Sequence, residues 1–452
     1  MTLDELKLYT VRVKDGSGCL FQPILNENNY TYILTAKHLF EGIAQDDDGN
    51  DLPYATQDGT DISIVRQVNV DGQWQKISIP FTLERGKTYF PHKDADAAIL
   101  KINHLSPQFD RIVSIDIPKI NNGLYLNGFP NQFGGQVGEE YTTYSIREIE
   151  ASGNYSQNAQ LTNDVLNKEQ IEGMSGGGIT SVQEDHISII GIQSRVKHPN
   201  WANGKVCFVP MKYFAEIINY EEYNTLLTKL HPPYVGKFDF LKDDAFTLKV
   251  DAWDENTISS TRIHLRNKAL SVIQSDVTPI GIKELFKKRL LIDEAEDHCL
   301  DTKNIWIAWL EFLTIINIVK EDSLTIQQLS ELFDSIRFKY LDTSDWTDLI
   351  PNKLSKSDYL GLQPDSTVIV STRMPPERPF IIPKGKIVDI ARVYDKSGFR
   401  TDKGMDPFTS FNFVHLDYFK KICIIDKMAS YENLSEQEFL TLLKKEYNEL
   451  FN

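Results

Sequence analysis

The chain has 452 residues, 41% hydrophobic and 25% charged, which is the composition of a folded protein with about three domains. Its 48 Lys and Arg against 64 Asp and Glu give a formal net charge of −16, which argues against a broad nucleic-acid-binding surface. No run approaches the ~20 apolar residues of a membrane span, and the start MTLDELKLYTVRV does not resemble a secretory signal, so a cytoplasmic protein is expected.

The first 230 residues have the pattern of a β-rich domain. Short runs of β-branched and aromatic residues alternate with Gly, Asn and Asp, which is typical of a sandwich or barrel. These runs cover residues 8–13, 30–34, 97–102, 123–126, 187–192 and 205–209. Helical spacing of apolar residues follows over 211–229, and His231-Pro232-Pro233 ends it, because proline does not continue a helix. We therefore expect one domain over 1–230, a linker over 231–236 and a second domain over 237–452.

The second part has a mixed α+β pattern rich in helices. Residues 305–320 are apolar nearly all round, which predicts a buried helix with Trp306 and Trp309 in the core. If part of that apolar stripe is exposed, it is an assembly surface. Further helices are expected over 323–338 and after Ser435, which forms a capping box with Glu438. Strands are expected over 367–371 and 386–393.

Three short motifs of the first domain carry the residues of an acyl-transfer site. They are GSGCLF followed by YILTAKH, which ends at His38, DADAAILKI with Asp96, and GMSGGG with Ser175. A serine oxygen becomes a good nucleophile when an imidazole takes its proton, and a carboxylate orients that imidazole. Glycines beside the serine allow backbone N–H groups to face a developing oxyanion.

These motifs, in this order and spacing, resemble those of trypsin-like serine peptidases, in particular the intracellular, HtrA-like branch without disulfides. Gly128-Phe129-Pro130 resembles the GxP element that the family carries between its last two motifs. The resemblance covers roughly residues 6–228. It implies an all-β double β-barrel and a serine endopeptidase.

Residue by residue, the resemblance assigns Ser175 as the nucleophile and His38 as the general base and then acid. Asp96 is the orienting carboxylate rather than Asp94, because in the family the aspartate directly precedes the small-apolar strand. The backbone N–H groups of Gly173 and Ser175 would form the oxyanion hole.

The substrate pocket is the less defined part of the assignment. Ser194, Arg195 and Val196 match the strand that pairs with a substrate backbone by β-addition. Glu169 lies where the family often keeps the residue at the base of its specificity pocket, which would favour Lys or Arg. The alternative for Glu169 is an exposed glutamate of a loop.

Simpler interpretations of the same residues stay open. A histidine after a strand is often structural, a glycine-rich serine segment is often only a loop, and a degenerate, non-catalytic peptidase fold is possible. The four cysteines lie far apart without CxxC spacing. Cys19 and Cys207 should therefore be reduced and buried. The histidines have no metal-ligand spacing, so no metal site is expected.

The C-terminal half shows no phosphate-binding loop, dinucleotide fingerprint or metal triad, so no cofactor is expected. A short basic segment contains Lys283, Lys287, Lys288 and Arg289. Such a segment is usually a solvated helix face, and otherwise contacts an acidic partner or nucleic acid.

Three segments of this half, DWTDLIP, VSTRM and FVHL, together with the layout of the chain, resemble effector subunits of bacterial ABC-ATPase three-component anti-phage systems, the Lamassu-like group. In that group a C-terminal domain docks onto an SMC-like ABC ATPase and a small third subunit. The resemblance implies a peptidase effector held in such a complex. The alternatives are a stand-alone cytoplasmic quality-control peptidase and a non-catalytic binding module on a peptidase fold.

Overall fold

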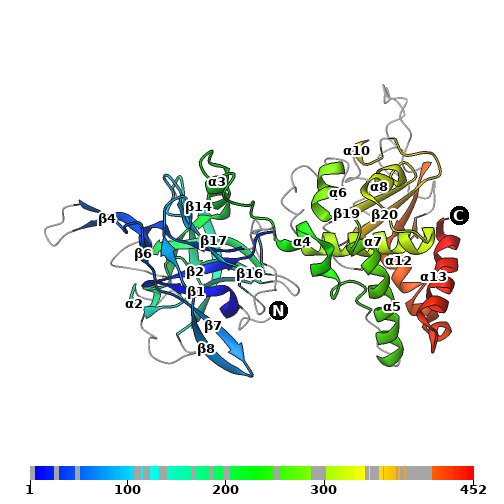
Figure 1. Ribbon diagram of the computed structural model, residues 1–452, viewed down its shortest axis with the longest axis horizontal. Helices are drawn as coiled ribbons and strands as arrows, with labels where there is room; N and C mark the ends of the chain where they lie inside the picture. Colours follow the sequence, from blue (N-terminus) through cyan, green and yellow to red (C-terminus); the bar gives the residue numbers. More distant parts are fainter. Residues whose placement is uncertain are drawn as a thin grey trace. The chain divides into compact units, whose positions relative to one another are not determined.

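The structure, a computed structural model, divides the chain into two compact units, Met1–Pro233 and Tyr234–Asn452. It describes residues 6–24, 30–45, 51–105, 113–115, 123–131, 140–151, 153–163, 168–182, 187–196, 204–248, 255–286, 302–341, 346, 356–359, 361–372, 375–376, 381–382 and 410–451. The first unit runs from blue to green in Figure 1 and the second from green to red. Among the helices of these ranges, none is long and apolar enough to cross a membrane.

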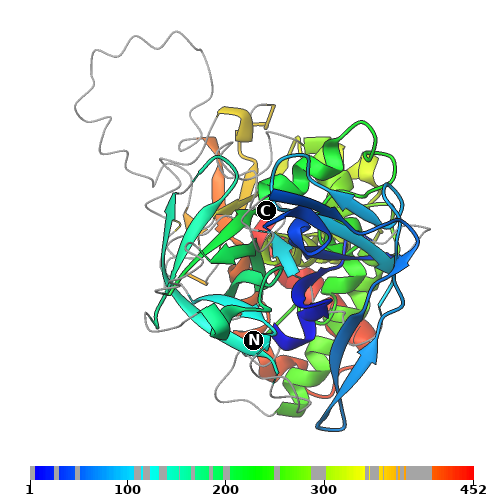
Figure 2. The same ribbon diagram turned by 90° about the vertical axis from the view of Figure 1, so that its left-hand side faces the viewer.

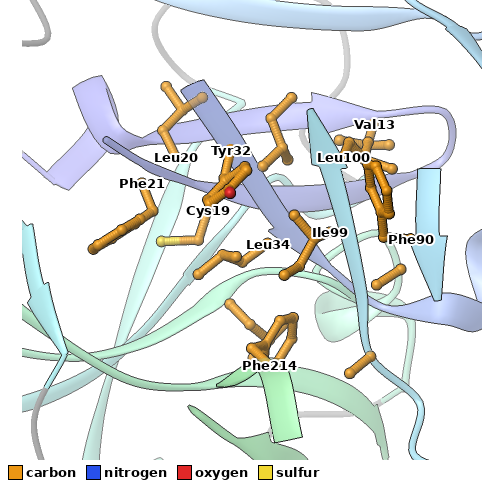
Figure 3. Packing of buried hydrophobic residues seen from close by; sticks show 14 of the residues in the cluster. Val13, Cys19, Leu20, Phe21, Tyr32, Leu34, Phe90, Ile99, Leu100 and Phe214 are labelled. Carbon is orange, nitrogen blue, oxygen red and sulfur yellow. The ribbon is translucent and has the colours of Figure 1, made fainter. Parts of the chain in front are cut away.

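The first sheet of the N-terminal unit has seven strands in the order β10-β11-β3-β2-β1-β7-β8, and all neighbours are antiparallel. The strands are β1 (Thr10–Val13), β2 (Gly16–Phe21), β3 (Tyr30–Thr35), β7 (Ile64–Val70), β8 (Gln73–Ser78), β10 (Tyr89–Pro91) and β11 (Ala98–Asn103). Strands β2 and β3 are buried along their whole length. Figure 3 shows their side chains packed with Phe90, Ile99 and Phe214 in one core.

The second sheet closes on itself. Its order is β12-β17-β16-β13-β14-β15-β18, and β17 also pairs with β18, which makes a closed barrel of six strands. The strands are β12 (Val113–Ile115), β13 (Leu124–Gly128), β14 (Thr142–Ala151), β15 (Gln157–Leu161), β16 (Gly178–Val182), β17 (Ile187–Val196) and β18 (Lys205–Pro210). The expected β-rich domain is therefore present. Among the described residues no pairing closes the first sheet, so the double barrel stays a prediction.

The two sheets lie next to each other in the unit. The first sheet is drawn in blue and the second in cyan to green (Figures 1 and 2). Smaller elements complete the unit: the hairpin of β4 (Glu41–Gln45) and β5 (Asp51–Ala55), the pair β6 (Thr60–Asp61) and β9 (Thr82–Leu83), the 3-10 helices η1 (Lys7–Tyr9) and η2 (Lys37–Leu39), and the helices α2 (Lys168–Ile171) and α3 (Met211–Asn219).

The helix expected over 211–229 is shorter than its apolar pattern. Helix α3 ends at Asn219, because Tyr220 turns to an extended conformation at φ −61° and ψ 137°. The remaining residues form turns, in which Leu227 and Leu230 are still buried. The apolar residues buried in these turns have near-helical spacing, so the sequence pattern predicted a longer helix.

The C-terminal unit is a four-stranded sheet surrounded by helices. The sheet order is β19-β20-β22-β21, with β19, β20 and β22 parallel and β21 antiparallel. Its strands are β19 (Ile336–Leu341), β20 (Thr367–Thr372), β21 (Ile381–Ile382) and β22 (Asn412–His415). The helices are α4 (Pro233–Gly236), η4 (Phe238–Leu241), α5 (Glu255–Ile273), α6 (Pro279–Phe286), α7 (Lys303–Lys320), α8 (Ile326–Leu332), α10 (Lys356–Tyr359), α12 (Leu416–Lys421), η8 (Ile425–Tyr431) and α13 (Glu436–Phe451).

Several expectations for this unit are confirmed. Helix α7 is the expected buried helix, and Trp306 and Trp309 have no exposed surface, so the apolar stripe is core rather than an assembly surface. Ser435 and Glu438 form the capping box of α13, because Glu438 N donates to Ser435 Oγ and Ser435 N donates to Glu438 Oε2.

One expectation is wrong and others fall outside the described residues. The helix expected over 323–338 stops at Leu332, and the residues from Ile336 onward pair with β20 as a parallel strand. The strand expected over 386–393 lies outside the described residues. Residues 233–236, expected in a linker, form α4, with Tyr234 and Val235 fully buried.

The expected buried thiols are present. Cys19 and Cys207 are free and only 3% and 5% exposed, and Cys423 is also free and buried. Burial raises the pKa of the Cys19 thiol to about 12, so this sulfur is an unreactive apolar group at neutral pH. Cys299 lies outside the described residues.

A buried histidine of the C-terminal unit predicts a pH dependence of stability. His415 has no exposed surface, and burial lowers its pKa to about 4 from the ordinary 6.5. The unfolded chain therefore takes up this proton first as the pH falls. We expect the contribution of His415 to the free energy of unfolding to be at its maximum above pH 6.5 and to decrease steadily toward pH 4. Urea unfolding across this range measures it, and a His415→Gln variant should show a shallower slope. Equal slopes would contradict the prediction.

Candidate functional site

His38 and Asp96 meet because their strands pair. Residues Ala98 to Asn103 of β11 run antiparallel to β3, with Ala98 opposite Thr35. Asp96, two residues before β11, is thereby brought close to the 3-10 helix η2 that follows β3. Asp96 Oδ2 lies 2.7 Å from His38 Nδ1, and Asp96 Oδ1 accepts from His38 N at 2.8 Å. A carboxylate accepts, so Nδ1 carries a proton, and in the neutral form of the ring Nε2 has the lone pair.

Asp96, rather than Asp94, is the carboxylate in contact with the imidazole. Asp94 is exposed, and its N–H donates to His92 Nδ1, as does that of Ala95. The buried His92 ring thus caps the turn that delivers Asp96 to His38.

The Asp96 carboxylate is held in its charged form. Burial is the largest influence on its pKa and would raise it, but the hydrogen bonds and charge of His38, with a hydrogen bond from Ser194, outweigh burial and lower the pKa. A carboxylate with a lowered pKa can fix the imidazole tautomer and stabilise a cationic ring.

Ser194 links the aspartate to the serine. Its hydroxyl donates to Asp96 Oδ2, and its backbone carbonyl accepts from Ser175 Oγ at 3.2 Å. The sequence predicted only a backbone role in substrate pairing for this residue. Its side-chain contact was missed, because one serine in an apolar strand gives no signal of its partner.

Ser175 lies in a turn between α2 and β16 that needs glycine. Gly176 has a φ of +90°, and a Cβ there would lie 1.9 Å from Ser17 O, so no other residue fits without displacing the backbone. Ser175 O accepts from Ser17 N at 2.7 Å. A Cβ on Gly16 would meet both Ser175 O and the Leu39 side chain at 2.7 Å, so the serine turn and the histidine turn flank the same glycine.

The two peptide groups around Gly173 are fixed by their carbonyl oxygens. Glu172 O accepts from Asn131 N at 2.7 Å, and Gly173 O accepts from the buried Ser17 hydroxyl at 2.8 Å. Ser17 Oγ in turn accepts from Phe129 N at 2.9 Å. In a planar trans peptide the N–H points away from the C=O, so the bond from Asn131 also orients Gly173 N–H.

The N–H of Ser175 is oriented in the same way, since Met174 O accepts from Gly177 N at 2.7 Å. Gly176 N donates to Gln193 O, also at 2.7 Å, and so docks the turn on β17. Within the described part of the chain, neither Gly173 N nor Ser175 N has an acceptor. Two N–H donors held in fixed peptides in the serine turn are the kind of groups that could bind an oxyanion.

The predicted pocket residues are placed less completely. Arg195 and Val196 end β17, where Arg195 is exposed and the side chain of Val196 lies outside the described residues. Glu169 is in α2, and its side chain too lies outside them. The described residues contain no cluster of His, Cys, Asp and Glu able to hold a metal ion.

Part of the basic segment of the C-terminal half can also be located. Lys283 is in α6, whereas 287–289 lie outside the described residues. Arg266 of α5, close to this segment in the sequence, donates to the backbone oxygens of Ala245 and Asp243. Its guanidinium therefore fastens α5 to the segment after η4.

Comparison with known proteins found a similarity in the C-terminal half. Residues 208–425 match the family model of C-terminal domain 4 of the ABC-three component (ABC-3C) systems. No curated protein matches the chain. The matched segment begins inside β18, so it includes the end of the barrel and the helix α3 as well as most of the C-terminal unit.

Proposed function

We propose that the chain is a serine endopeptidase, and that its C-terminal half attaches it to the other components of an ABC-three component system. The match over residues 208–425 supports the attachment. The contact of Asp96 with His38, close to a serine turn with two unused N–H donors, supports the hydrolysis. The partners are an SMC-like ABC ATPase and a small third subunit of an anti-phage system, and the cellular site of action is the cytoplasm.

In the proposed reaction, Ser175 Oγ turns from Ser194 O toward His38 Nε2, which takes its proton as the oxygen attacks the substrate carbonyl carbon. The new oxyanion accepts from Gly173 N and Ser175 N. The imidazolium, stabilised by Asp96, returns the proton to the leaving amine. Water then repeats the sequence on the acyl ester and regenerates the serine.

Covalent labelling tests the peptidase directly. A fluorophosphonate should form a stoichiometric adduct with the native chain at Ser175, identified by peptide mass spectrometry. Labelling should disappear in Ser175→Ala and persist in Ser181→Ala, a serine buried in the same barrel. If the native chain stays unlabelled both alone and in complex with its partners, the result would favour the non-catalytic binding module.

Co-purification tests the attachment. The tagged full chain, expressed with the genes that neighbour it, should bring down an ABC ATPase and a small third protein, and Ser175→Ala should do so equally well. A chain that hydrolyses protein and purifies alone under these conditions would instead be a stand-alone peptidase.

Ser17 supplies a prediction for the oxyanion donors. Ser17→Ala removes the hydroxyl that holds Gly173 O, and so frees the peptide between the two donor peptides. We expect kcat to fall about 10-fold with KM little changed, since a net hydrogen bond is worth about 1 kcal/mol. The initial rate of fluorophosphonate labelling should fall by the same factor. Thr10→Val is the control, because Thr10 Oγ1 donates to Leu6 O in the same sheet, outside the site. Equal effects of the two variants would contradict the role of Ser17.

A further inference from the structure

A second polar site lies in the N-terminal unit. A cavity of about 180 Å³ is lined by β1, by the hairpin β7–β8 and by residues on either side of the β13 to β14 connection, Phe129, Asn131 and Glu140. Figure 1 shows this hairpin at the lower end of the unit. The polar and aromatic side chains at the cavity are Arg12, Gln67, Lys76, Phe129, Asn131 and Glu140.

The charges of this cavity leave Arg12 without a contacting counter-ion. Lys76 Nζ pairs with Glu140 Oε1 at 2.7 Å. Arg12 Nη1 donates to the neutral amide oxygen of Asn131 at 3.1 Å, and the guanidinium lies over the Phe129 ring. In the described residues Arg12 has no ion pair; Glu140 and Asp15 act on it only through the electrostatic field. A guanidinium has five N–H donors, so further donors remain for a ligand.

A buried acceptor at the same cavity also lacks a partner. Gln67 is 1% exposed, and its Nε2 lies 3.4 Å from Glu140 Oε2, which sets the orientation of the amide. Its Oε1 is buried with no hydrogen-bond donor among the described residues. A buried amide oxygen without a donor costs free energy, so this wall of the cavity carries a polar group that the described residues do not satisfy.

We propose that this cavity binds a carboxylate of a peptide. The Arg12 guanidinium would hold the carboxylate in a charge-assisted pair, as guanidinium groups do with planar two-oxygen anions. The Phe129 ring, only 1% exposed, lies beneath the guanidinium and supports it at the cavity. The carboxylate belongs either to an Asp or Glu side chain or to a peptide C-terminus.

The cavity is joined to the candidate oxyanion loop through Asn131. The Asn131 side chain accepts from Arg12, while its N–H donates to Glu172 O and so orients Gly173 N–H. Asn131 Oδ1 lies only 2.5 Å from the position of a Cβ on Gly173. A carboxylate on the unused nitrogens of Arg12 would hold the guanidinium, and with it Asn131, in place. This regulatory consequence rests on the proposed peptidase function; the binding itself does not.

Binding is tested with the full-length Ser175→Ala chain, so that no probe is hydrolysed. Titration calorimetry at low salt uses three probes: N-acetyl-Gly-Asp-Gly-amide, N-acetyl-triglycine as the free acid, and the neutral N-acetyl-Gly-Asn-Gly-amide. We expect the first or the second to bind, which identifies the source of the carboxylate, and the neutral probe to bind at least 10-fold more weakly. Arg12→Gln should lose at least 10-fold in affinity, whereas Lys212→Gln, an exposed lysine of α3, should lose none.

Arg12→Lys is a second variant for the case that Arg12→Gln fails to fold, because it keeps the positive charge but not the planar set of donors. It should bind the acidic probe several-fold more weakly than the native chain does. The proposed site would be overturned if neither acidic probe binds, or if the neutral probe binds equally well. It would also be overturned if Arg12→Gln and Lys212→Gln have equal effects.

Coupling is measured on the native serine. A saturating acidic probe should raise the rate of fluorophosphonate labelling at least 3-fold, and the neutral probe should leave it unchanged. Probe binding with an unchanged or lower rate would overturn the coupling. Probe binding to a chain that never becomes labelled would refute the proposed peptidase and leave the carboxylate site standing.

Discussion

Replacing Ser175 with alanine is expected to lower kcat for peptide hydrolysis by about 10⁴-fold or more, which is the usual cost of removing one member of a catalytic triad. The fold should be unaffected. Ser175 is partly exposed, and its Oγ makes one long hydrogen bond, at 3.2 Å to Ser194 O, so alanine removes only one weak contact.

The decisive measurement is a double-mutant comparison. If Ser175 and His38 act as one unit, the His38→Ala, Ser175→Ala double variant should lose little more than either single variant. Thermal unfolding of all three should match the native chain within a few degrees. Full activity in Ser175→Ala, or losses that multiply, would refute the assignment of the nucleophile.

Replacing Lys420 with methionine is expected to destabilise the C-terminal unit by about 3–5 kcal/mol, the range for breaking a buried ion pair by removing one partner. Lys420 Nζ lies 2.7 Å from Asp417 Oδ1 and 3.0 Å from Glu311 Oε2, and the Glu311 side chain is only 4% exposed. Burial would lower the pKa of Lys420, but these carboxylates raise it, so the ammonium stays charged. Without it, two carboxylates remain in a largely buried site.

The matched control for this effect is Lys444→Met in the same unit. Lys444 Nζ pairs with Glu321 Oε1 at 2.7 Å, but that glutamate is 71% exposed, so its loss should cost no more than about 1 kcal/mol. Calorimetric unfolding of the full chains compares the two variants. Equal losses would show that the Glu311–Lys420–Asp417 cluster does not stabilise the unit beyond a surface pair.

Local patterns in the sequence predicted elements that depend on local physics. The apolar run over 305–320 gave α7, and the capping box at Ser435 gave the start of α13. The order of the motifs also placed His38 and Asp96 in contact through the pairing of β3 with β11. The catalytic roles of these residues remain predictions until the serine is tested.

The failures came where long-range contacts decide the structure. Nothing between Leu332 and Ile336 breaks a helical pattern, and only the parallel pairing with β20 makes 336–341 a strand. The hydroxyl contact of Ser194 with Asp96 and the cavity at Arg12 also join segments far apart in the chain. No periodicity or spacing within one segment encodes such a meeting.

The start of the matched family region has a consequence for grafting this C-terminal half onto another protein. Strand β18 closes the barrel, and α3 contributes Phe214 to the core of the first sheet (Figure 3). A chimaera that begins at residue 208 would divide β18 and carry α3 without the core that buries Phe214, and the exposed apolar side chains would favour aggregation. A chimaera joined between Pro233 and Tyr234 leaves each hydrophobic core with the segment that completes it.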